Sequence, residues 1–384
     1  MRPLEGILVL DFAQYLAGPS AALRLADLGA RVVKVERPQG GDNGRRLVFK
    51  NLISDGDGVL FHTINRNKES YTADLKDPEQ LARVKKLIAQ ADVLIENFRP
   101  GTMERLGLGY EEVKKLNKGI VYGSVTGYGS RGPWVKRPGQ DLLIQSLSGF
   151  VWLNGDDGQM PVPAALAIAD AYTGIHLAEG ILACLLRRLK TGEGGLVEVS
   201  LMESVLDFQF EALTTYLNDG HQPPKRCRVH NAHPYLGAPY GIYPTADGCI
   251  ALAMGSLQTL GQVLDIPELE GVSAMDAFDR RDELKGLIEK KLMTDSAQHW
   301  LEKLGAAGYW CSEVLDWNRL IQTEGFQSLD MLIHTGRPGC EDLVTTRCPI
   351  RIDGQWDRRG KWAPRLGEDT EKITRDYGLD REEG

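Results

Sequence analysis

The first 130 residues predict an α/β fold with a parallel, doubly wound sheet. Apolar runs of strand length recur at Ile7–Phe12, Arg31–Glu36, Asp92–Glu96 and Ile120–Thr126. Segments with helical spacing lie between these runs, and strands that alternate with helices pair in parallel. Beyond residue 218 the alternation of strand and helix segments gives way to a long irregular segment, which predicts a second, smaller α+β domain.

Two of the intervening helices have clear local signals. Pro19–Leu28 has apolar residues at helical spacing and is followed by Gly29, which ends it. The tetrapeptide Asp77-Pro78-Glu79-Gln80 begins the other helix. Asp77 can cap its free backbone N–H groups, and proline suits the first helical position.

The remaining pattern defines the later elements and the domain boundaries. In chain order we expect a helix over Ala171–Lys190, a strand over Leu196–Leu201, a helix over Met202–Leu217, a β-hairpin turning at Asp247-Gly248, and helices near Asp282–Leu292 and Ala297–Leu304. We therefore predict a large domain over 1–224, completed by the C-terminal segment 331–384. The small domain is predicted over 225–330.

Composition and charge argue against several classes of protein. The 384 residues are 42% hydrophobic, and 45 basic against 53 acidic residues give a net charge of −8. This negative excess argues against a general nucleic-acid binder. No uninterrupted apolar run has membrane-spanning length, and the N-terminus reaches an acidic residue too early for a signal peptide. We expect a cytoplasmic protein with neither a nucleic-acid nor a membrane partner.

Cysteine and histidine spacing argues against a metal site. The six cysteines form no CxxC motif, and the seven histidines form no HExxH motif. Isolated thiols are typical of a reduced, cytosolic chain.

Polar and basic residues follow the ends of the predicted strands. Arg37 follows one strand, the segment Asn97-Phe98-Arg99 follows another with Arg105 close behind, and Lys76 stands just before a helix start. Ligands bind at the carboxyl ends of strands in open α/β sheets, and arginine suits phosphate groups. Solvated basic residues also surround ordinary clefts, so these residues leave a phosphate-bearing ligand and a plain charged surface equally open.

The segment Gly127-Tyr128-Gly129-Ser130-Arg131-Gly132 matches the GxGxxG pattern of dinucleotide-binding turns. Such a turn must open a helix whose N-terminus holds the pyrophosphate. Here Pro133-Trp134 follows, and no helical pattern begins before Asp141. We interpret the segment as a glycine-rich turn that lines a cleft.

Asp170 stands among small apolar residues in ALAIADAYTG, directly before the expected helix. A buried carboxylate is costly unless it has local partners or a function. Its position favours a helix N-cap, as does that of Asp141 in RPGQDLLIQSLSGF. We expect the helix N-terminus to keep Asp170 ionised with a low pKa, which is the state that attacks an acyl group.

Eight ordered motifs resemble the family III CoA-transferases, also called the CaiB/BaiF family. They are GILVLDFAQYLAGPSAALRLADLGARVVKVERP, NRNKESYTADLK, ADVLIENFRPGTMERLGLGYE, GSVTGYGSRGP, RPGQDLLIQSLSGF, IADAYTGIHLAEGILACLLRRLKTGEGGLVEVSLME, HPYLGAPYGIYPTADG and LGEDTEKI. The resemblance covers nearly the whole chain. It implies a Rossmann-like large domain, a smaller domain, and an interlocked homodimer of two chains threaded as linked rings.

The resemblance also implies a chemistry and its residues. An aspartate carries the acyl group and CoA in turn, through an aspartyl anhydride and an aspartyl-CoA thioester, and by motif it is Asp170. Asp141 is the acidic or polar position upstream. The positions implied to contact CoA are Arg37, Lys76, Asn97, Phe98, Arg99 and Arg105. CoA passes from an acyl-CoA donor to a small carboxylic acid, without a metal or a permanently bound cofactor.

Gln140 distinguishes between the two activities, CoA transfer and racemisation, that the resemblance implies. Related α-methylacyl-CoA racemases carry a histidine immediately before the position matched by Asp141, where this chain has Gln140. Glutamine cannot shuttle a proton, so Gln140 favours the transferase. The alternatives are a 2-methylacyl-CoA racemase or epimerase and a non-catalytic CoA-binding protein.

The acyl pocket is expected to include Tyr15 and Gln140. Oxalate-handling members of the family carry a glutamine where this chain has Leu16, and a multi-glycine loop where it has Ala253-Met254-Gly255-Ser256. A formyl-CoA:oxalate activity is therefore not expected. A mixed polar pocket suits a small hydroxy-, keto- or dicarboxylic acid, and the residues leave these three open.

Overall fold

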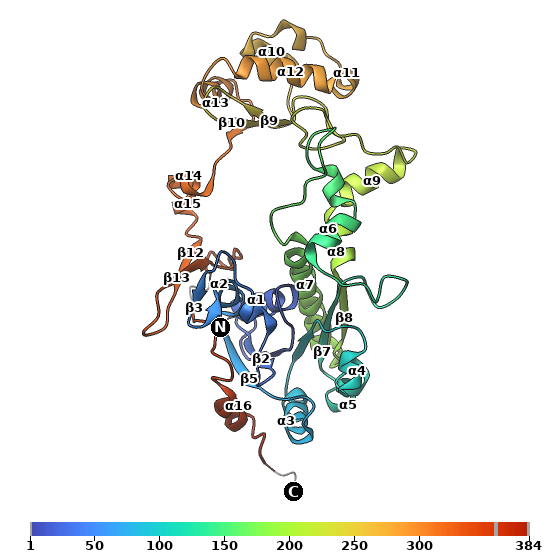
Figure 1. The fold of residues 1–384 in the computed structure, drawn as a ribbon, viewed down its shortest axis with the longest axis vertical. Coiled ribbons are helices and arrows are strands. Elements are labelled where there is room, and N and C mark those ends of the chain that lie inside the picture. Colours follow the sequence, from blue (N-terminus) through green and yellow to red (C-terminus); the bar gives the residue numbers. More distant parts are fainter. Residues whose placement is uncertain (1, 357–359, 382–384) are drawn as a thin grey trace. The chain divides into compact units, whose positions relative to one another are not determined.

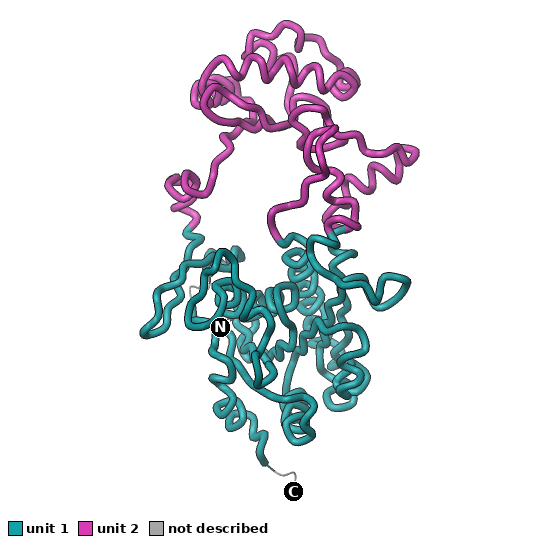
Figure 2. The backbone as a smooth tube through the Cα atoms, viewed as in Figure 1, with its two compact units in different colours: residues 1–144, 167–205, 330–384 teal, residues 145–166, 206–329 magenta. Residues whose placement is uncertain are grey.

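The computed structural model describes residues 2–356 and 360–381 (Figure 1). The chain divides into two compact units, coloured separately in Figure 2. Unit 1 comprises 1–144, 167–205 and 330–384, and unit 2 comprises 145–166 and 206–329. The predicted small domain lies within unit 2 except for its last residue. Unit 2 also includes 145–166 and 206–224, which the sequence pattern assigns to the large domain.

Unit 1 is built on a six-stranded parallel sheet. Its strands are β1 (Leu8–Asp11), β2 (Arg31–Glu36), β5 (Lys68–Thr72), β6 (Val93–Glu96), β7 (Val121–Thr126) and β8 (Gly195–Ser200). They lie in the order β5-β2-β1-β6-β7-β8, and all neighbours pair in parallel. The order reverses between β1 and β6, so the sheet is doubly wound as predicted. The loops after these two strands therefore flank the crevice where such sheets bind ligands.

Helices cover both faces of this sheet. One face is covered by α1 (Ala17–Asp27) and α7 (Ile168–Thr191), and the other by α3 (Pro78–Ala89), α4 (Thr102–Arg105), α5 (Tyr110–Leu116) and α16 (Thr370–Asp376). Other elements before residue 148 and after 330 are β3 (Ile53–Ser54), β4 (Asp57–Gly58), α2 (Val59–Asn65), α6 (Asp141–Leu147), β12 (Leu332–Thr335), β13 (Leu343–Thr346) and the 3₁₀ helix Asn43–Arg46, and α8 (Leu201–Phe208) follows β8. The predicted start of α3 is confirmed, because Asp77 Oδ1 accepts from the Glu79 and Gln80 N–H groups at 2.9 and 3.1 Å.

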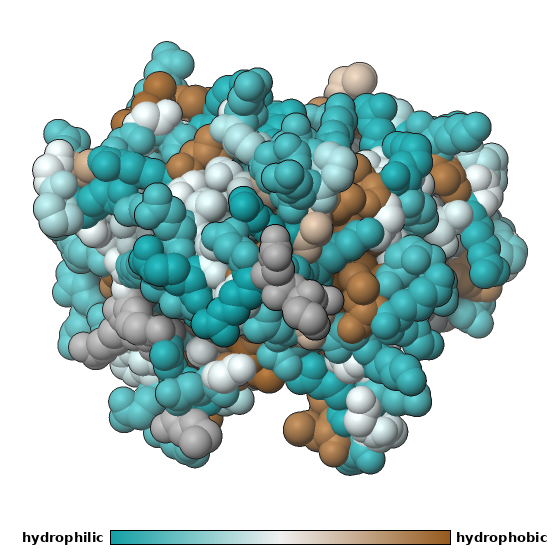
Figure 3. Space-filling view, turned by 90° about the horizontal axis from the view of Figure 1, so that it is seen from below, coloured by the Kyte–Doolittle hydropathy of each residue, from teal (hydrophilic) through white to brown (hydrophobic). Residues whose placement is uncertain are grey.

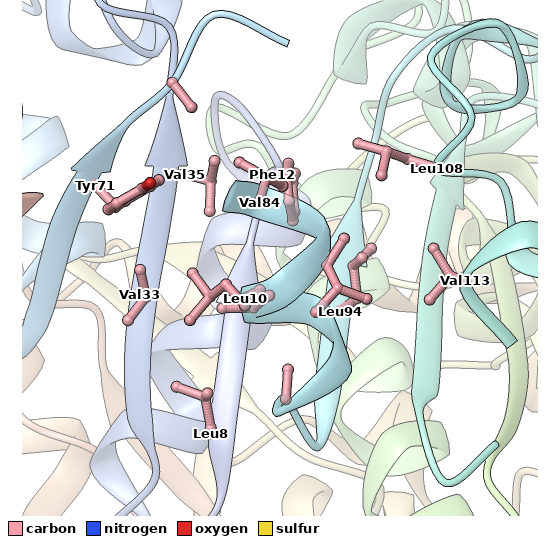
Figure 4. Close-up of a cluster of buried hydrophobic side chains, with 14 of the residues drawn as sticks. Leu8, Leu10, Phe12, Val33, Val35, Tyr71, Val84, Leu94, Leu108 and Val113 are labelled. Atoms are coloured by element: carbon pink, nitrogen blue, oxygen red, sulfur yellow. The ribbon is translucent and has the colours of Figure 1, made fainter. Parts of the chain in front are cut away.

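The two faces of the sheet differ in chemistry because successive strand residues point to opposite sides. On the α3 face, Leu10, Val33, Tyr71 and Leu94 form an apolar core with Val84 of α3 (Figure 4). The α1 face instead buries charged residues at the alternate positions, namely Asp11, Lys34, Glu36 and Lys68. β5, whose sequence is KESYT, therefore lacks the apolar run that predicts a buried strand. This strand was therefore not predicted.

The C-terminal segment covers β5, which is an edge strand of the sheet. Ser70 N–H donates to Asp369 Oδ2 at 3.0 Å, and Asp369 N–H donates back to the Ser70 carbonyl at 3.1 Å. Thr72 N–H donates to Thr370 Oγ1 at 3.0 Å. Covering an edge in this way removes a site for unwanted strand pairing. It also gives the LGEDTEKI motif a structural role.

Helices α1 and α7 lie in close contact through Gly174. A Cβ atom at this position would lie 2.2 Å from Ser20 Oγ and 2.9 Å from the Ala17 carbonyl oxygen, both on α1. Any side chain here would push the two helices apart. Gly174 therefore lets the first turns of α7 rest directly on α1.

Among the described helices, α7 is long and apolar enough to cross a membrane by length and composition. In unit 1 its Leu177 and Ile181 pack against Gly123 of β7, so both are buried in the sheet interface. The face of the molecule in Figure 3 is mostly hydrophilic, with hydrophobic residues in separate patches.

Unit 2 combines a small antiparallel sheet with helices. The sheet has the order β11-β10-β9, from β9 (Gly241–Pro244), β10 (Cys249–Leu252) and β11 (Cys311–Glu313). The helices are α9 (Phe210–Asn218), α10 (Leu257–Leu264), α11 (Ala274–Asp279), α12 (Arg281–Leu292), α13 (Ala297–Ala306), α14 (Trp317–Leu320) and α15 (Glu324–Ser328), with 3₁₀ helices at Phe150–Leu153 and Pro267–Leu269. The predicted hairpin and the helices α12 and α13 are confirmed. The single helix predicted over 202–217 is instead two, α8 and α9, separated at Gln209.

Candidate active site

Side chains from neighbouring strands fix the backbone of the loop after β1. Lys34 Nζ donates to the Ala13 carbonyl at 2.7 Å. Asn97, directly after β6, accepts from Gln14 N–H at 2.8 Å and donates to the Gln14 carbonyl at 2.7 Å. Tyr15 N–H donates to Asp42 Oδ1 at 3.1 Å. The loop thereby holds Tyr15 at φ +64°, a conformation uncommon for non-glycine residues, with half of its side chain exposed.

Two fully buried lysines lie beneath this loop. Lys34 pairs with Asp42 at 2.9 Å and Asp11 at 3.6 Å. Lys68 donates to Asp11 at 2.8 Å and to Asn65 Oδ1 at 2.8 Å. Burial opposes the charged form of Lys34, but the carboxylates around it outweigh that cost and raise its pKa. Burial lowers the pKa of Lys68 to about 8, because Asp11 offsets less of the cost there.

A cavity of about 630 Å³ opens at the carboxyl ends of β1, β2, β5 and β6, all within unit 1. Arg37 and Phe98, which follow predicted strands, and Lys76, which stands before a helix start, lie on its wall. Lys34 and Asp42 also line it, and neither was predicted. A lysine inside the buried strand RVVKVE was the available signal, because a charge at such a position must have a buried partner.

Three other predicted CoA contacts lie differently. Arg99 and Arg105 are exposed and are not among the residues that line the cavity, and Arg105 donates to Thr102 Oγ1 at 3.0 Å. The amide group of Asn97 is engaged with Gln14, so this side chain shapes the loop after β1 in the structure described.

Glu96, at the end of β6, supports the same edge of the sheet and was not predicted. It is buried and accepts from Phe98 N–H at 2.9 Å and from Ser124 Oγ at 2.5 Å. Burial raises the pKa of Glu96 to about 7. The carboxyl group holds Phe98 at the cavity wall through the backbone.

Asp170 lies inside the first turn of α7, which begins at Ile168 rather than at residue 171. The prediction that Asp170 caps this helix is wrong. The N-cap residue is Ala167, whose side chain makes no capping hydrogen bond. Instead Asp141 Oδ1 accepts from the Ala169 and Asp170 N–H groups at 2.7 and 3.2 Å.

The expected low pKa of Asp170 is also wrong. Burial, and then repulsion from the Asp141 carboxylate, raise the pKa of Asp170 to about 7. The backbone N–H groups that would have lowered it donate to Asp141 instead. Near neutral pH the carboxyl group of Asp170 is therefore partly protonated and partly ionised.

The glycine-rich turn after β7 brings Asp141 to α7. Residues 127–140 contain no helix, so the structure excludes a dinucleotide-binding turn as predicted. Gly127 and Gly139 lie back to back, because a Cβ atom on either would lie within 2.7 Å of the other's Cα. Gln140 is exposed, and its carbonyl accepts from Ile144 N–H at 3.0 Å, which starts α6 at Asp141.

The two histidines near the small-domain hairpin have carboxylate partners. His230 Nε2 lies 2.9 Å from Glu289 Oε2, and His233 Nε2 lies 3.4 Å from Glu211 Oε1. The described residues include no group of three or more His, Cys, Asp or Glu side chains that could hold a metal ion.

Comparison with known proteins agrees with this arrangement. The family described as CoA-transferase family III matches residues 4–370. The chain belongs to this family. This family III CoA-transferase is 37% identical over 295 residues to the succinate–glutarate CoA-transferase of Agrobacterium fabrum, covering 76% of this chain and 72% of the relative. It is 32% identical to the acetyl-CoA:oxalate CoA-transferase of Acetobacter aceti, covering 98% and 96%.

Solved structures show the same fold. A CaiB/BaiF family protein from Brucella suis superposes with a TM-score of 0.83 at 30% identity, covering 98% of this chain and 99% of that one. Rv3272 from Mycobacterium tuberculosis gives 0.83 at 29% identity, covering 97% and 99%.

The raised pKa of Asp170 predicts how the stability of this CoA-transferase depends on pH. The folded state binds this proton more tightly than the unfolded state, whose pKa is near 3.8. The stabilisation is therefore complete below pH 4 and is lost as the pH rises through about 7. Asp170→Asn should therefore raise the melting temperature clearly more at pH 8 than at pH 5.

The matched control is Glu179→Gln, an exposed carboxylate on the same helix. It should shift the melting temperature little at either pH. Equal shifts for Asp170→Asn at pH 5 and pH 8 would contradict the raised pKa.

Proposed function

We propose that this enzyme transfers CoA from an acyl-CoA donor to a small dicarboxylic acid, with Asp170 as the nucleophile. The observation that carries the proposal is the partly buried Asp170 carboxyl group at the start of α7, with its pKa near neutrality. Relatives named for glutarate, oxalate and mesaconate favour a dicarboxylic acid among the acids that the sequence leaves open.

The reaction consists of four acyl transfers. The Asp170 carboxylate attacks the thioester carbonyl, the C–S bond breaks, and CoA thiolate leaves an acyl-aspartyl anhydride. The thiolate then attacks the Asp170 carbonyl carbon and releases the donor acid as a carboxylate. The acceptor carboxylate attacks the resulting aspartyl-CoA thioester and releases thiolate again. Attack of thiolate on the acceptor's carbonyl gives the new acyl-CoA and restores the Asp170 carboxylate.

This scheme requires a carboxylate that is both nucleophilic and partly ionised at neutral pH. One thioester replaces another, so the enzyme supplies orientation rather than driving force. A carboxylate with a pKa near 7 is more basic, and so more nucleophilic, than an ordinary aspartate, while a useful fraction stays ionised at neutral pH. The burial that raises the pKa also keeps water from the anhydride.

The cavity at the strand ends is proposed to hold the nucleotide end of CoA. Arg37 and Lys76 supply positive charge for phosphate groups, and Phe98 supplies an aromatic face for the adenine ring. Arg99 and Arg105 are exposed and follow Phe98 closely in the chain. We propose that they contact phosphate groups that extend beyond the cavity. Tyr15 and Gln140 are proposed to meet the acyl group.

We also propose a cytoplasmic homodimer. Large apolar side chains from α6 to α9 are exposed in the single chain, among them Leu142, Leu166, Leu189, Phe210 and Leu217. So much exposed apolar surface is typical of an interface between subunits. Light scattering should therefore give twice the 42.5 kDa mass of the chain, and a monomer at micromolar concentration would contradict this.

Trapping tests the nucleophile. Succinyl-CoA or acetyl-CoA with hydroxylamine should inactivate the enzyme and leave a hydroxamate on Asp170, because hydroxylamine cleaves both the anhydride and the thioester. Peptide mass spectrometry locates the adduct, and Glu179→Gln serves as the active control. Turnover by Asp170→Ala, or α-hydrogen exchange on a 2-methylacyl-CoA without any adduct, would contradict the proposal and favour the racemase.

Calorimetry with CoA tests the cavity. Arg37→Ala and Lys76→Ala should each weaken CoA binding about tenfold or more, because each removes a charged hydrogen-bond donor from a phosphate. The loss should shrink as salt concentration rises. Lys290→Ala, an exposed lysine of unit 2, is the matched control. Unchanged affinity in both cavity variants would place CoA elsewhere.

A further inference from the structure

We propose that Asp141 is a positioning residue for Asp170: its carboxylate holds the first turn of α7 from outside the helix and places a fixed negative charge beside the nucleophile. The inference rests on the proposed function, in which Asp170 attacks the acyl group. It goes further by giving Asp141 two separable tasks, one geometric and one electrostatic.

The geometric task follows from the way α7 begins. The first backbone N–H groups of a helix have no partner within it, so a side chain or water must accept them. The residues before α7 are small and apolar, and Ala167 cannot cap it. A single oxygen, Asp141 Oδ1, instead accepts from Ala169 and Asp170 across 28 and 29 residues of sequence.

Asp141 is itself held firmly. It follows the Gly127–Gly139 contact, which closes the loop after β7, and the Gly127 carbonyl accepts from Met202 N–H at 3.1 Å. As the first residue of α6, Asp141 stands on regular structure anchored by the buried Ile144. A cap on such a support can fix the direction in which α7 presents Asp170.

The electrostatic task follows from the surroundings of Asp170. On α1, the residues nearest to Gly174 of α7 are Ala17, Ser20 and Ala21, none of which carries a charge. On α7 itself, His176 lies within 3.1 Å of Ser204 Oγ. Among the described residues, the charge that acts on Asp170 is that of Asp141, and it favours the protonated form.

Two substitutions separate the tasks. Asp141→Asn keeps an oxygen that can accept both N–H groups but removes the charge, whereas Asp141→Ala removes both. The readout is the rate of hydroxylamine trapping at Asp170 as a function of pH, since substrate and hydroxylamine ionise identically with every variant. Glu179→Gln on the exposed side of α7 is the control and should reproduce the wild-type profile.

We expect the rate of the wild-type enzyme to be half-maximal near pH 7 on its acid limb. Asp141→Asn should move that limb to lower pH by about one unit or more and keep most of the plateau rate. Asp141→Ala should move the limb similarly but lower the plateau at least tenfold, because Asp170 loses its fixed direction.

Each failure has a distinct meaning. An unshifted acid limb in Asp141→Asn would overturn the electrostatic task, and equal plateaus in the two variants would overturn the geometric task. Wild-type enzyme that yields no hydroxamate on Asp170 at any pH would instead overturn the proposed function. Melting curves show whether Asp141→Ala folds, and if it does not, a plateau in Asp141→Asn below a tenth of wild type would overturn the geometric task.

Discussion

Buried charge pairs beneath the loop after β1 constrain this entire edge of the sheet. Lys34 and Lys68 are fully buried, and each would be very costly there without its partners. Asp11 accepts from Lys68 and lies close to Lys34, so moving any of the three would leave an unpaired charge. The same ammonium group of Lys34 also holds the loop backbone. The strained conformation of Tyr15 persists because its surroundings determine it from several sides.

The charge pairs extend from this loop to the end of the chain. Glu36 accepts from Arg45 at 2.7 and 2.8 Å and from Ser70 Oγ at 2.8 Å. Ser70 Oγ in turn accepts from Gly367 N–H at 2.9 Å. A residue on the cavity wall is thereby linked to the segment that covers β5. Segments that are far apart in sequence must therefore fold together before the cavity has its final shape.

Local sequence patterns predicted the elements whose signal is local. Strands β1, β2, β6, β7 and β8 follow apolar runs, and α3 begins at its own Asp77 cap. The pattern failed where partners come from elsewhere in the chain. β5 carries lysine and glutamate because distant side chains neutralise them, and the amide of Asn97 turns to Gln14 across the point where the strand order reverses. Capping rules likewise assigned the start of α7 to the nearest aspartate, because sequence spacing cannot reveal a cap supplied from 29 residues away.

Asp77 and Asp170 show what that non-local cap achieves. Both lie at helix N-termini, where a carboxylate usually gains hydrogen bonds and a lower pKa. Asp77 accepts from the backbone N–H groups of α3, and these lower its pKa. Asp170 has the opposite shift, because burial and then the Asp141 carboxylate raise its pKa, and Asp141 accepts the N–H groups of α7 that could have lowered it. No described residue donates a hydrogen bond to the Asp170 carboxylate. A carboxylate that accepts hydrogen bonds from a helix N-terminus is less basic and therefore a weaker nucleophile toward an acyl group. Because Asp141 caps α7, the Asp170 carboxylate stays basic and available for this attack.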